Sequence, residues 1–182
     1  MILYISGLNS SYKSYIKTTL DSQFKTDCSY YVIQGDFQVD MKKLLEIVDG
    51  VNEVFVIGHS TGGFYGLTLF RMVSNVICVN LINPAIDLTW SINKNNPTNH
   101  FDTHQINKVK NDNDLYYKDK VFPIYCYQGL DDDRVNVEYN RLFIKKCSGT
   151  IDLISAFGHR FSEIEFKTIL SRIHNNFLEP DF

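Results

Sequence analysis

Residues 54–66 of the chain read VFVIGHSTGGFYG. The first four residues are apolar and largely β-branched, which predicts a strand buried on both faces, as in a parallel sheet. After the glycines, apolar side chains recur at helical spacing, from Phe64 through Leu67 to Phe70. The stretch therefore predicts a strand, a sharp turn and a helix, with Ser60 in the turn.

The turn itself matches the pattern G-x-S-x-G, in which a serine occupies a strained turn between a strand and a helix. Glycine at positions 58 and 62 lets the strand and the helix approach each other closely. The alternative interpretation is a glycine-rich turn that binds phosphate through its backbone amides. No lysine follows the glycines as in a P-loop, and G-x-G-x-x-G is absent. We therefore interpret Ser60 as a nucleophile, and the sequence indicates no cofactor.

Length and composition predict a single domain over residues 1–182, since 182 residues with 44% hydrophobic content suffice for a core. The net charge of −3 is too small to favour a nucleic-acid partner. Four widely spaced cysteines without a C-x-x-C pair indicate free thiols in a reducing cytosol. Because we see no signal peptide and no apolar run of roughly 18 residues, we expect a soluble, cytoplasmic protein. The oligomeric state stays open.

Elsewhere the chain alternates short apolar runs with segments of helical spacing. Further strands are predicted at residues 1–5, 30–33, 76–82, 121–127 and 151–154, and helices around 15–20, 41–48, 64–73, 137–146 and 161–177. Strands that alternate with helices are typical of an α/β fold with right-handed crossovers. The pattern predicts an open, mainly parallel sheet of about six strands with helices on both faces.

Residues 86–120 break this alternation. The segment is polar and turn-rich near residues 93–99 and carries scattered aromatic side chains, among them Trp90. A connection of this length is usually functional. We interpret it either as a lid or cap over a site or as a solvated insertion with one short helix. If it is a lid, Trp90 is a candidate substrate contact, although core packing would explain the aromatic side chains equally well.

Polar residues follow several of the predicted strands. In open α/β sheets, sites lie beyond the carboxyl ends of the strands. Ser60 follows one strand, the three aspartates at 131–133 follow another, and His159 follows the last. Serine, aspartate and histidine in this chain order are typical of an α/β-hydrolase triad.

Four segments carry a resemblance to a known family. They are LYISGLNSS at 3–11, GHSTGGFY at 58–65, NPA at 83–85 and GHRF at 158–161. In their order and spacing they resemble a minimal α/β-hydrolase, most similar to the small bacterial esterases of the YqiA group, over nearly the full length. Most hydrolases have histidine before the oxyanion-loop glycine, where this chain has Ser6. The resemblance implies hydrolysis of a carboxylic ester or acyl thioester and selects no particular substrate.

The expected roles follow from the chemistry of acyl transfer. Ser60 needs a general base, and His159 is suited to take its proton near neutral pH and to return it to the leaving group. An aspartate should hold the imidazole in the correct tautomer. The segment GLDDDRV at 129–135 resembles the hydrolase pattern G-x-x-D-x-x-V, which places the acid at Asp132, with Asp133 as the second candidate.

Other site residues are expected around this triad. The backbone N–H groups of Leu8 and Thr61 should form the oxyanion hole. Asn9 would either donate to the substrate or cap the helix that follows it. His59, next to the nucleophile, is expected to pack or form a hydrogen bond there, where it could also contact substrate. The pair His100 and His104 lacks a third ligand and a firm helix, so we predict no metal site.

The leading hypothesis is a serine hydrolase that cleaves a small-molecule ester or thioester through an acyl-enzyme. One alternative is an acyltransferase or amidase with the same triad, since only the acceptor or the bond that is cleaved would differ. Another is a non-catalytic hydrolase-like domain that binds a ligand or partner, which Ser6 in the oxyanion loop motivates.

Overall fold

A computed structural model describes residues 1–8, 10, 14–24, 26–95, 101–118, 121–155 and 157–178. Within these residues the chain forms six strands, which are β1 (Ile2–Ser6), β2 (Cys28–Val32), β3 (Val54–His59), β4 (Val76–Ile82), β5 (Ile124–Gly129) and β6 (Thr150–Ile154). It also forms seven helices, which are α1 (Ser14–Gln23), α2 (Phe37–Val48), α3 (Thr61–Met72), α4 (Leu88–Asn95), α5 (Thr103–Tyr117), α6 (Val137–Lys146) and α7 (Glu163–Leu178).

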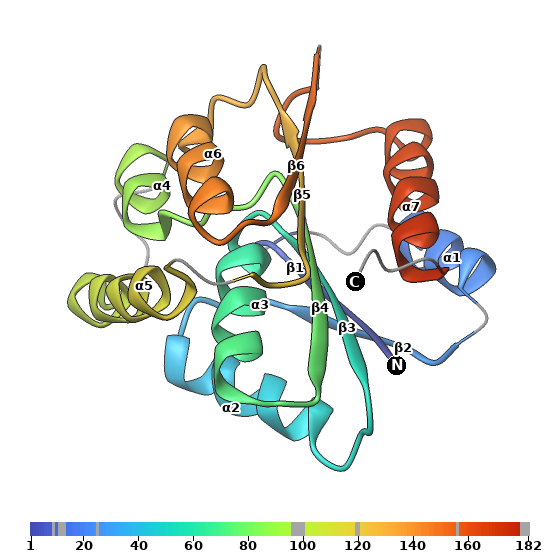
Figure 1. Cartoon of the computed structure of the whole chain (residues 1–182), viewed down its shortest axis with the longest axis horizontal. Coiled ribbons are helices and arrows are strands. Elements are labelled where there is room, and N and C mark those ends of the chain that lie inside the picture. Colours follow the sequence, from blue (N-terminus) through green and yellow to red (C-terminus); the bar gives the residue numbers. More distant parts are fainter. Residues whose placement is uncertain are drawn as a thin grey trace.

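The strands form one sheet in the order β2-β1-β3-β4-β5-β6, and every neighbouring pair is parallel. The order reverses direction between β1 and β3, as in doubly wound sheets. Helices α1 and α7 cover one face of the sheet, and α2 to α6 lie on the other (Figure 1). The predicted open parallel sheet with helices on both faces is confirmed.

Each face of the sheet has its own hydrophobic core. On the α1 and α7 face, Leu20 and Leu170 pack with side chains of the sheet such as Tyr4. On the other face, α3 lies across the centre of the sheet and buries Phe64 and Leu67 completely. Strand β1 is buried along its whole length between these layers. The two cores fix the strands whose carboxyl ends carry the predicted site residues.

Most element boundaries lie close to the predicted ones. Strand β4 and helix α6 have the predicted limits. Strand β5 begins at Ile124, three residues later than expected, because Pro123 has no N–H to donate and Val121 is exposed. Helix α7 begins at Glu163, since Ser162 and Glu165 form a reciprocal capping box at its N-terminus.

Residues 86–120 differ from the expectation of one short helix, since two helices, α4 and α5, occupy this segment. Helix α5 is fixed to α3. The Tyr117 hydroxyl donates to the Leu67 carbonyl at 2.6 Å, and the Asn113 amide donates to the Thr68 hydroxyl at 3.1 Å. The interpretation as a solvated insertion with one short helix is therefore wrong, because the segment contains two helices and α5 is bonded to α3.

A buried carboxylate connects α2 to β2 and α3. Asp40 is fully buried and accepts hydrogen bonds from the Tyr31 and Tyr65 hydroxyls, at 2.7 and 3.3 Å. It also accepts the backbone N–H groups of Gln34 and Gly35, each at 3.0 Å. Burial, together with the adjacent carboxylate, raises the pKa of both tyrosines, so that both remain protonated donors.

Replacing Asp40 with alanine is expected to lower the free energy of unfolding by about 3 kcal/mol, because buried donors lose their acceptor. Urea denaturation measures this change. Asp36→Ala is the matched control, since Asp36 caps the same helix by accepting the Gln38 and Val39 amides and should cost only about 1 kcal/mol. Equal losses in the two variants would contradict a special role for the buried network.

The four cysteines are free thiols. Cys78, Cys126 and Cys147 are buried, and Cys28 is partly buried. Burial raises the pKa of the Cys78 thiol to about 12, so it stays protonated at neutral pH and behaves as a small apolar side chain. Within the described residues no helix is both long enough and apolar enough to cross a membrane.

Candidate active site

Ser60 lies at the junction of β3 and α3 in a strained backbone conformation. Its φ of 55° and ψ of −123° are rare for a residue with a side chain. The turn is held in place because the Ser60 N–H donates to the Ile82 carbonyl at 3.1 Å, and its own carbonyl accepts the Gly63 and Ala85 amides, each at 2.9 Å. The backbone therefore presents the Ser60 side chain at the N-terminal end of α3, where the helix dipole favours negative charge.

The two glycines of the G-x-S-x-G motif each relieve a collision. A Cβ at position 58 would lie 2.7 Å from the Gly62 carbonyl oxygen, so the strand and helix approach too closely for any side chain there. A Cβ at position 62 would collide with the carbonyl oxygen of Ile5. The glycine at position 62 therefore lets helix α3 pack closely against β1, the neighbouring strand. The sequence suggested a close approach only between α3 and β3, the strand before the turn.

His159 lies on the loop after β6 and contacts Ser60. The Ser60 Oγ is 2.8 Å from the His159 Nε2, across 99 residues of sequence. The imidazole is largely enclosed, with 13% of its side chain exposed. The opposite ring nitrogen, Nδ1, lies 2.8 and 3.1 Å from the two carboxylate oxygens of Asp132. Hydroxyl, imidazole and carboxylate thus form one chain of hydrogen bonds.

Of the three adjacent aspartates, Asp132 alone reaches this chain. Its side chain is fully buried, and its Oδ1 also accepts the Arg134 backbone N–H at 2.9 Å. Asp131 and Asp133 are exposed. Two hydrogen bonds to the carboxylate, one from the ring and one from the backbone, fix its orientation toward His159. Val135, which follows Arg134 directly, is buried in the hydrophobic core and anchors the turn.

A network of buried amides joins the loops that carry Asp132 and His159. The Asn83 side chain, after β4, donates to the Gly158 carbonyl at 2.8 Å and accepts the Gly129 N–H at 2.7 Å. The Asn140 amide continues the network, since it donates to Gln128 at 2.8 Å and to the Pro84 carbonyl at 2.7 Å. Asn83 has a φ of 43°, a left-handed conformation that asparagine tolerates better than most residues.

Segment 83–85 belongs to the family resemblance, but no role for Asn83 follows from the sequence. The signal that could have found it is an asparagine between the end of a buried strand and a proline, where a polar side chain needs partners. Its partners, however, are 46 and 75 residues away in the sequence, so no local pattern identifies them.

The loop after β1 passes directly beside Ser60. A Cβ on Gly7 would lie 3.0 Å from the Ser60 Cβ and 3.3 Å from its Oγ. Backbone hydrogen bonds also form in turns, loops and caps. Among the described residues, the N–H groups of Leu8 and Thr61 donate in none of these bonds. Both residues line the cavity at Ser60. The oxyanion-hole role of these two N–H groups stays a prediction.

A cavity of about 430 Å³ opens at Ser60 and His159. One wall is apolar and comes from α4, the residues that flank it and the loop after Asp132; its residues are Ala85, Leu88, Ile92, Phe101 and Val135. The opposite wall comes from β1, α1 and the loop before α7; its residues include Tyr4, Tyr15, Ile16 and Phe161. The volume suits a small organic molecule.

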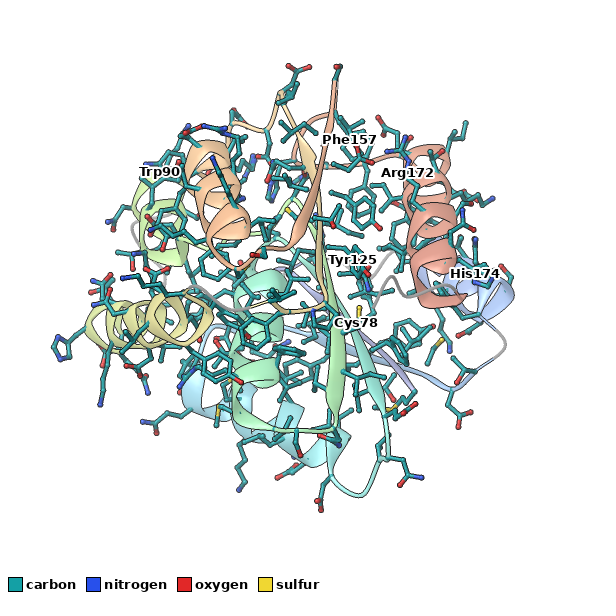
Figure 2. All side chains as sticks on the ribbon, viewed as in Figure 1. Cys78, Trp90, Tyr125, Phe157, Arg172 and His174 are labelled. Carbon is teal, nitrogen blue, oxygen red and sulfur yellow. The ribbon has the colours of Figure 1, made fainter. Side chains whose placement is uncertain are left out.

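The remaining predicted site residues have different positions. His59 lines the cavity, its ring centroid lies 4.7 Å from that of Phe161, and its Nε2 lies 3.4 Å from the His159 carbonyl. Trp90 is not among the cavity-lining residues. Its ring lies under the Lys94 ammonium, 4.8 Å away, on the α4 and α6 side of the sheet (Figure 2). Asn9 lies outside the described residues, so its expected contact stays a prediction.

The two histidines that were weighed as metal ligands do not meet in a described site. His104 is exposed on α5, and His100 lies outside the described residues. Over the part of the chain that the structure describes, no three His, Cys, Asp or Glu side chains are grouped as metal ligands would be.

Comparison of the sequence with protein-family models and with curated proteins gives no match. Solved structures do match. Est1E from Butyrivibrio proteoclasticus superposes with a TM-score of 0.70 at 14% identity, over 97% of this chain and 88% of that one. The Paleococcus ferrophilus monoacylglycerol lipase gives 0.70 at 12% identity, over 96% of this chain and 93% of that one.

A third similar structure is an α/β hydrolase enzyme from the metagenome of lagoon sediments at Mar Chica, Morocco. Its TM-score is 0.71 at 16% identity, over 100% of this chain and 91% of that one. The chain therefore has the α/β-hydrolase fold. At these identities the likeness concerns the fold, and the activity has to be argued from the site.

Proposed function

We propose that this protein is a serine hydrolase that cleaves a carboxylic ester or acyl thioester through an acyl-enzyme intermediate. The observation that carries the proposal is the continuous chain of hydrogen bonds from the Ser60 hydroxyl through both nitrogens of His159 to the buried Asp132 carboxylate. Similarity in fold to structures named as esterases and a lipase supports it.

In the proposed acylation step, the Ser60 Oγ attacks the substrate carbonyl carbon while its proton passes to the His159 Nε2. The carbonyl oxygen becomes an oxyanion, which accepts hydrogen bonds from the Leu8 and Thr61 N–H groups. His159 then gives the proton to the departing alcohol or thiol, and an ester of Ser60 remains.

In the proposed deacylation step, water takes the place of the leaving group. His159 removes a proton from the water as its oxygen attacks the acyl carbon, and the same proton returns to the Ser60 oxygen when the carboxylic acid departs. Asp132 keeps the ring in the tautomer that exposes Nε2 as a base and stabilises the imidazolium that forms in both steps. No cofactor takes part.

Several finer points belong to the same proposal. We infer that α4 and the segment around Phe101 act as a cap, because they supply most of the apolar cavity wall. We keep the hypothesis of a kinship with the YqiA-type esterases, and we propose a cytoplasmic location, which the four free thiols support.

Hydrolysis of short-chain 4-nitrophenyl esters and of an acyl thioester by the purified protein tests the proposed function. The absence of any turnover of these substrates would contradict the proposed function.

Asn83 should affect turnover through the loops that it joins. Asn83→Gly keeps the left-handed backbone and removes both side-chain hydrogen bonds, so we expect kcat to fall about 10- to 100-fold with little change in KM. Steady-state kinetics measure this split. Asn75→Ala is the control, because the Asn75 amide also joins two carbonyls, those of Val48 and Val51, in another part of the fold. Equal kcat losses in both variants would contradict the positioning role.

A further inference from the structure

The charged side chains around the cavity are of one sign. Two arginines, Arg134 and Arg160, belong to its lining, and no aspartate or glutamate does within the described residues. Arg134 comes two residues after Asp132, and Arg160 follows His159 directly. The chain as a whole carries a net charge of −3. The charged residues of the cavity lining are therefore basic, although the protein as a whole is acidic.

The partners of the other arginines make the contrast clearer. The chain has five arginines, and three of them bind other side chains. Arg71 donates to the Asn113 side chain at 2.8 Å, Arg141 pairs with Glu138 at 2.7 Å, and Arg172 pairs with Asp152. The remaining two, Arg134 and Arg160, are exposed, and their guanidinium groups form no hydrogen bond or ion pair with another described residue. These two are the arginines of the cavity.

The backbone at both arginines is nevertheless fixed. The Arg134 N–H donates to Asp132, and its carbonyl accepts the Asn95 amide at 2.7 Å. The His159 carbonyl, next to Arg160, lies within 3.4 Å of the Asn83 amide. Asp131 and Asp133 are close in sequence, but neither lines the cavity nor forms an ion pair with a described arginine. Two fixed points of the loops thus carry two exposed arginines that belong to the lining of the cavity at Ser60.

A guanidinium group binds a carboxylate through two parallel N–H donors, and it does so better than an ammonium group because it is planar. A basic cavity mouth also attracts anions from solution. We propose that the preferred substrate is an ester or thioester that also carries a carboxylate, and that Arg134 and Arg160 bind this carboxylate. This inference rests on the proposed hydrolase function and narrows its substrate class.

The test compares esters that are matched in size and differ in charge. The mono-4-nitrophenyl ester of glutaric acid and 4-nitrophenyl valerate have the same acyl length, and only the first carries a carboxylate on the acyl side. The butyrates of 3-hydroxybenzoate and 3-methylphenol place the charge on the alcohol side instead. We expect kcat/KM for at least one anionic ester to exceed that of its neutral partner about tenfold at low ionic strength, as two partly solvated charge pairs would give.

The double variant R134Q/R160Q should bring this ratio close to one. R141Q is the matched control, since it removes the same type of side chain from an exposed ion pair on α6 and should leave the ratio as it is. Salt near 1 M, where the screening length is about 3 Å, should also lower the ratio. A ratio near one in the unaltered protein for both ester pairs, or a ratio that R134Q/R160Q does not change, overturns the inference.

Binding separates this inference from the hydrolase proposal. Calorimetry with Ser60→Ala protein measures the affinity for each ester without turnover. If no ester is hydrolysed, the proposed function fails, yet tighter binding of the anionic esters that disappears in the additional R134Q/R160Q background would still support the anion site. If neither anionic ester binds more tightly than its neutral partner, the anion site is rejected.

Discussion

Ser60→Ala is expected to lower kcat for a 4-nitrophenyl ester by about 10⁴-fold or more, because the acyl-enzyme cannot form without the hydroxyl. The fold should be unchanged, since alanine fits wherever the serine Cβ fits and the Ser60 backbone bonds do not involve its side chain. Initial rates at saturating ester measure the loss. Pre-steady-state traces of the variant should show no burst of product.

Labelling with a fluorophosphonate provides the second measurement. The unaltered protein should gain the probe mass on the peptide that contains Ser60, and the Ser60→Ala protein should stay unlabelled. Ser171→Ala, on the exposed surface of α7, is the control and should be labelled and turn over normally. Turnover that survives in Ser60→Ala, or a label on another residue, would remove the basis of the proposed mechanism.

Asp132→Asn is expected to lower kcat by about 10⁴-fold with little change in KM. An asparagine at this position can donate its amide hydrogens to the His159 Nδ1 and would then stabilise the tautomer in which Nε2 carries the proton and cannot act as a base. The variant should fold, because the amide oxygen can still accept the Arg134 backbone N–H. Steady-state kinetics on the same ester measure the loss.

Asp133→Asn and Asp131→Asn are the matched controls for Asp132. Both side chains are exposed, so each variant should stay within about twofold of the unaltered kcat. A large loss at Asp133 with near-normal turnover at Asp132 would show that the acid had been assigned to the wrong aspartate. The sequence left these two candidates open, and the hydrogen bonds to His159 favour Asp132.

The sequence predicted the fold well where local patterns determine the elements. Strand β4 was bounded correctly because its apolar run ends at an asparagine and a proline. Strand β5 was extended too far, since apolar residues continue through the loop that precedes it. Helix α5 was missed because it is polar on most sides and buries only a narrow stripe that includes Ile106, Val109 and Tyr117.

For the candidate site, the sequence named the three residues that the structure brings together, through a motif and the order of the strand ends. It could not predict the contacts of Asn83 or the arrangement of Arg134 and Arg160 around the cavity. Those features depend on how separate loops converge in three dimensions, which neither periodicity nor spacing describes. Trp90 was predicted to contact substrate as an aromatic residue of the 86–120 segment, but it is not in the cavity lining and its ring lies under the Lys94 ammonium.

The hydrogen bonds of the Asn83 side chain limit how such a protein can change during evolution. One amide joins the turn that bears the acid to the turn that bears the base, so an insertion or deletion in either turn would disturb both at once. The lengths of these two turns should therefore remain constant while other parts of the cavity wall change.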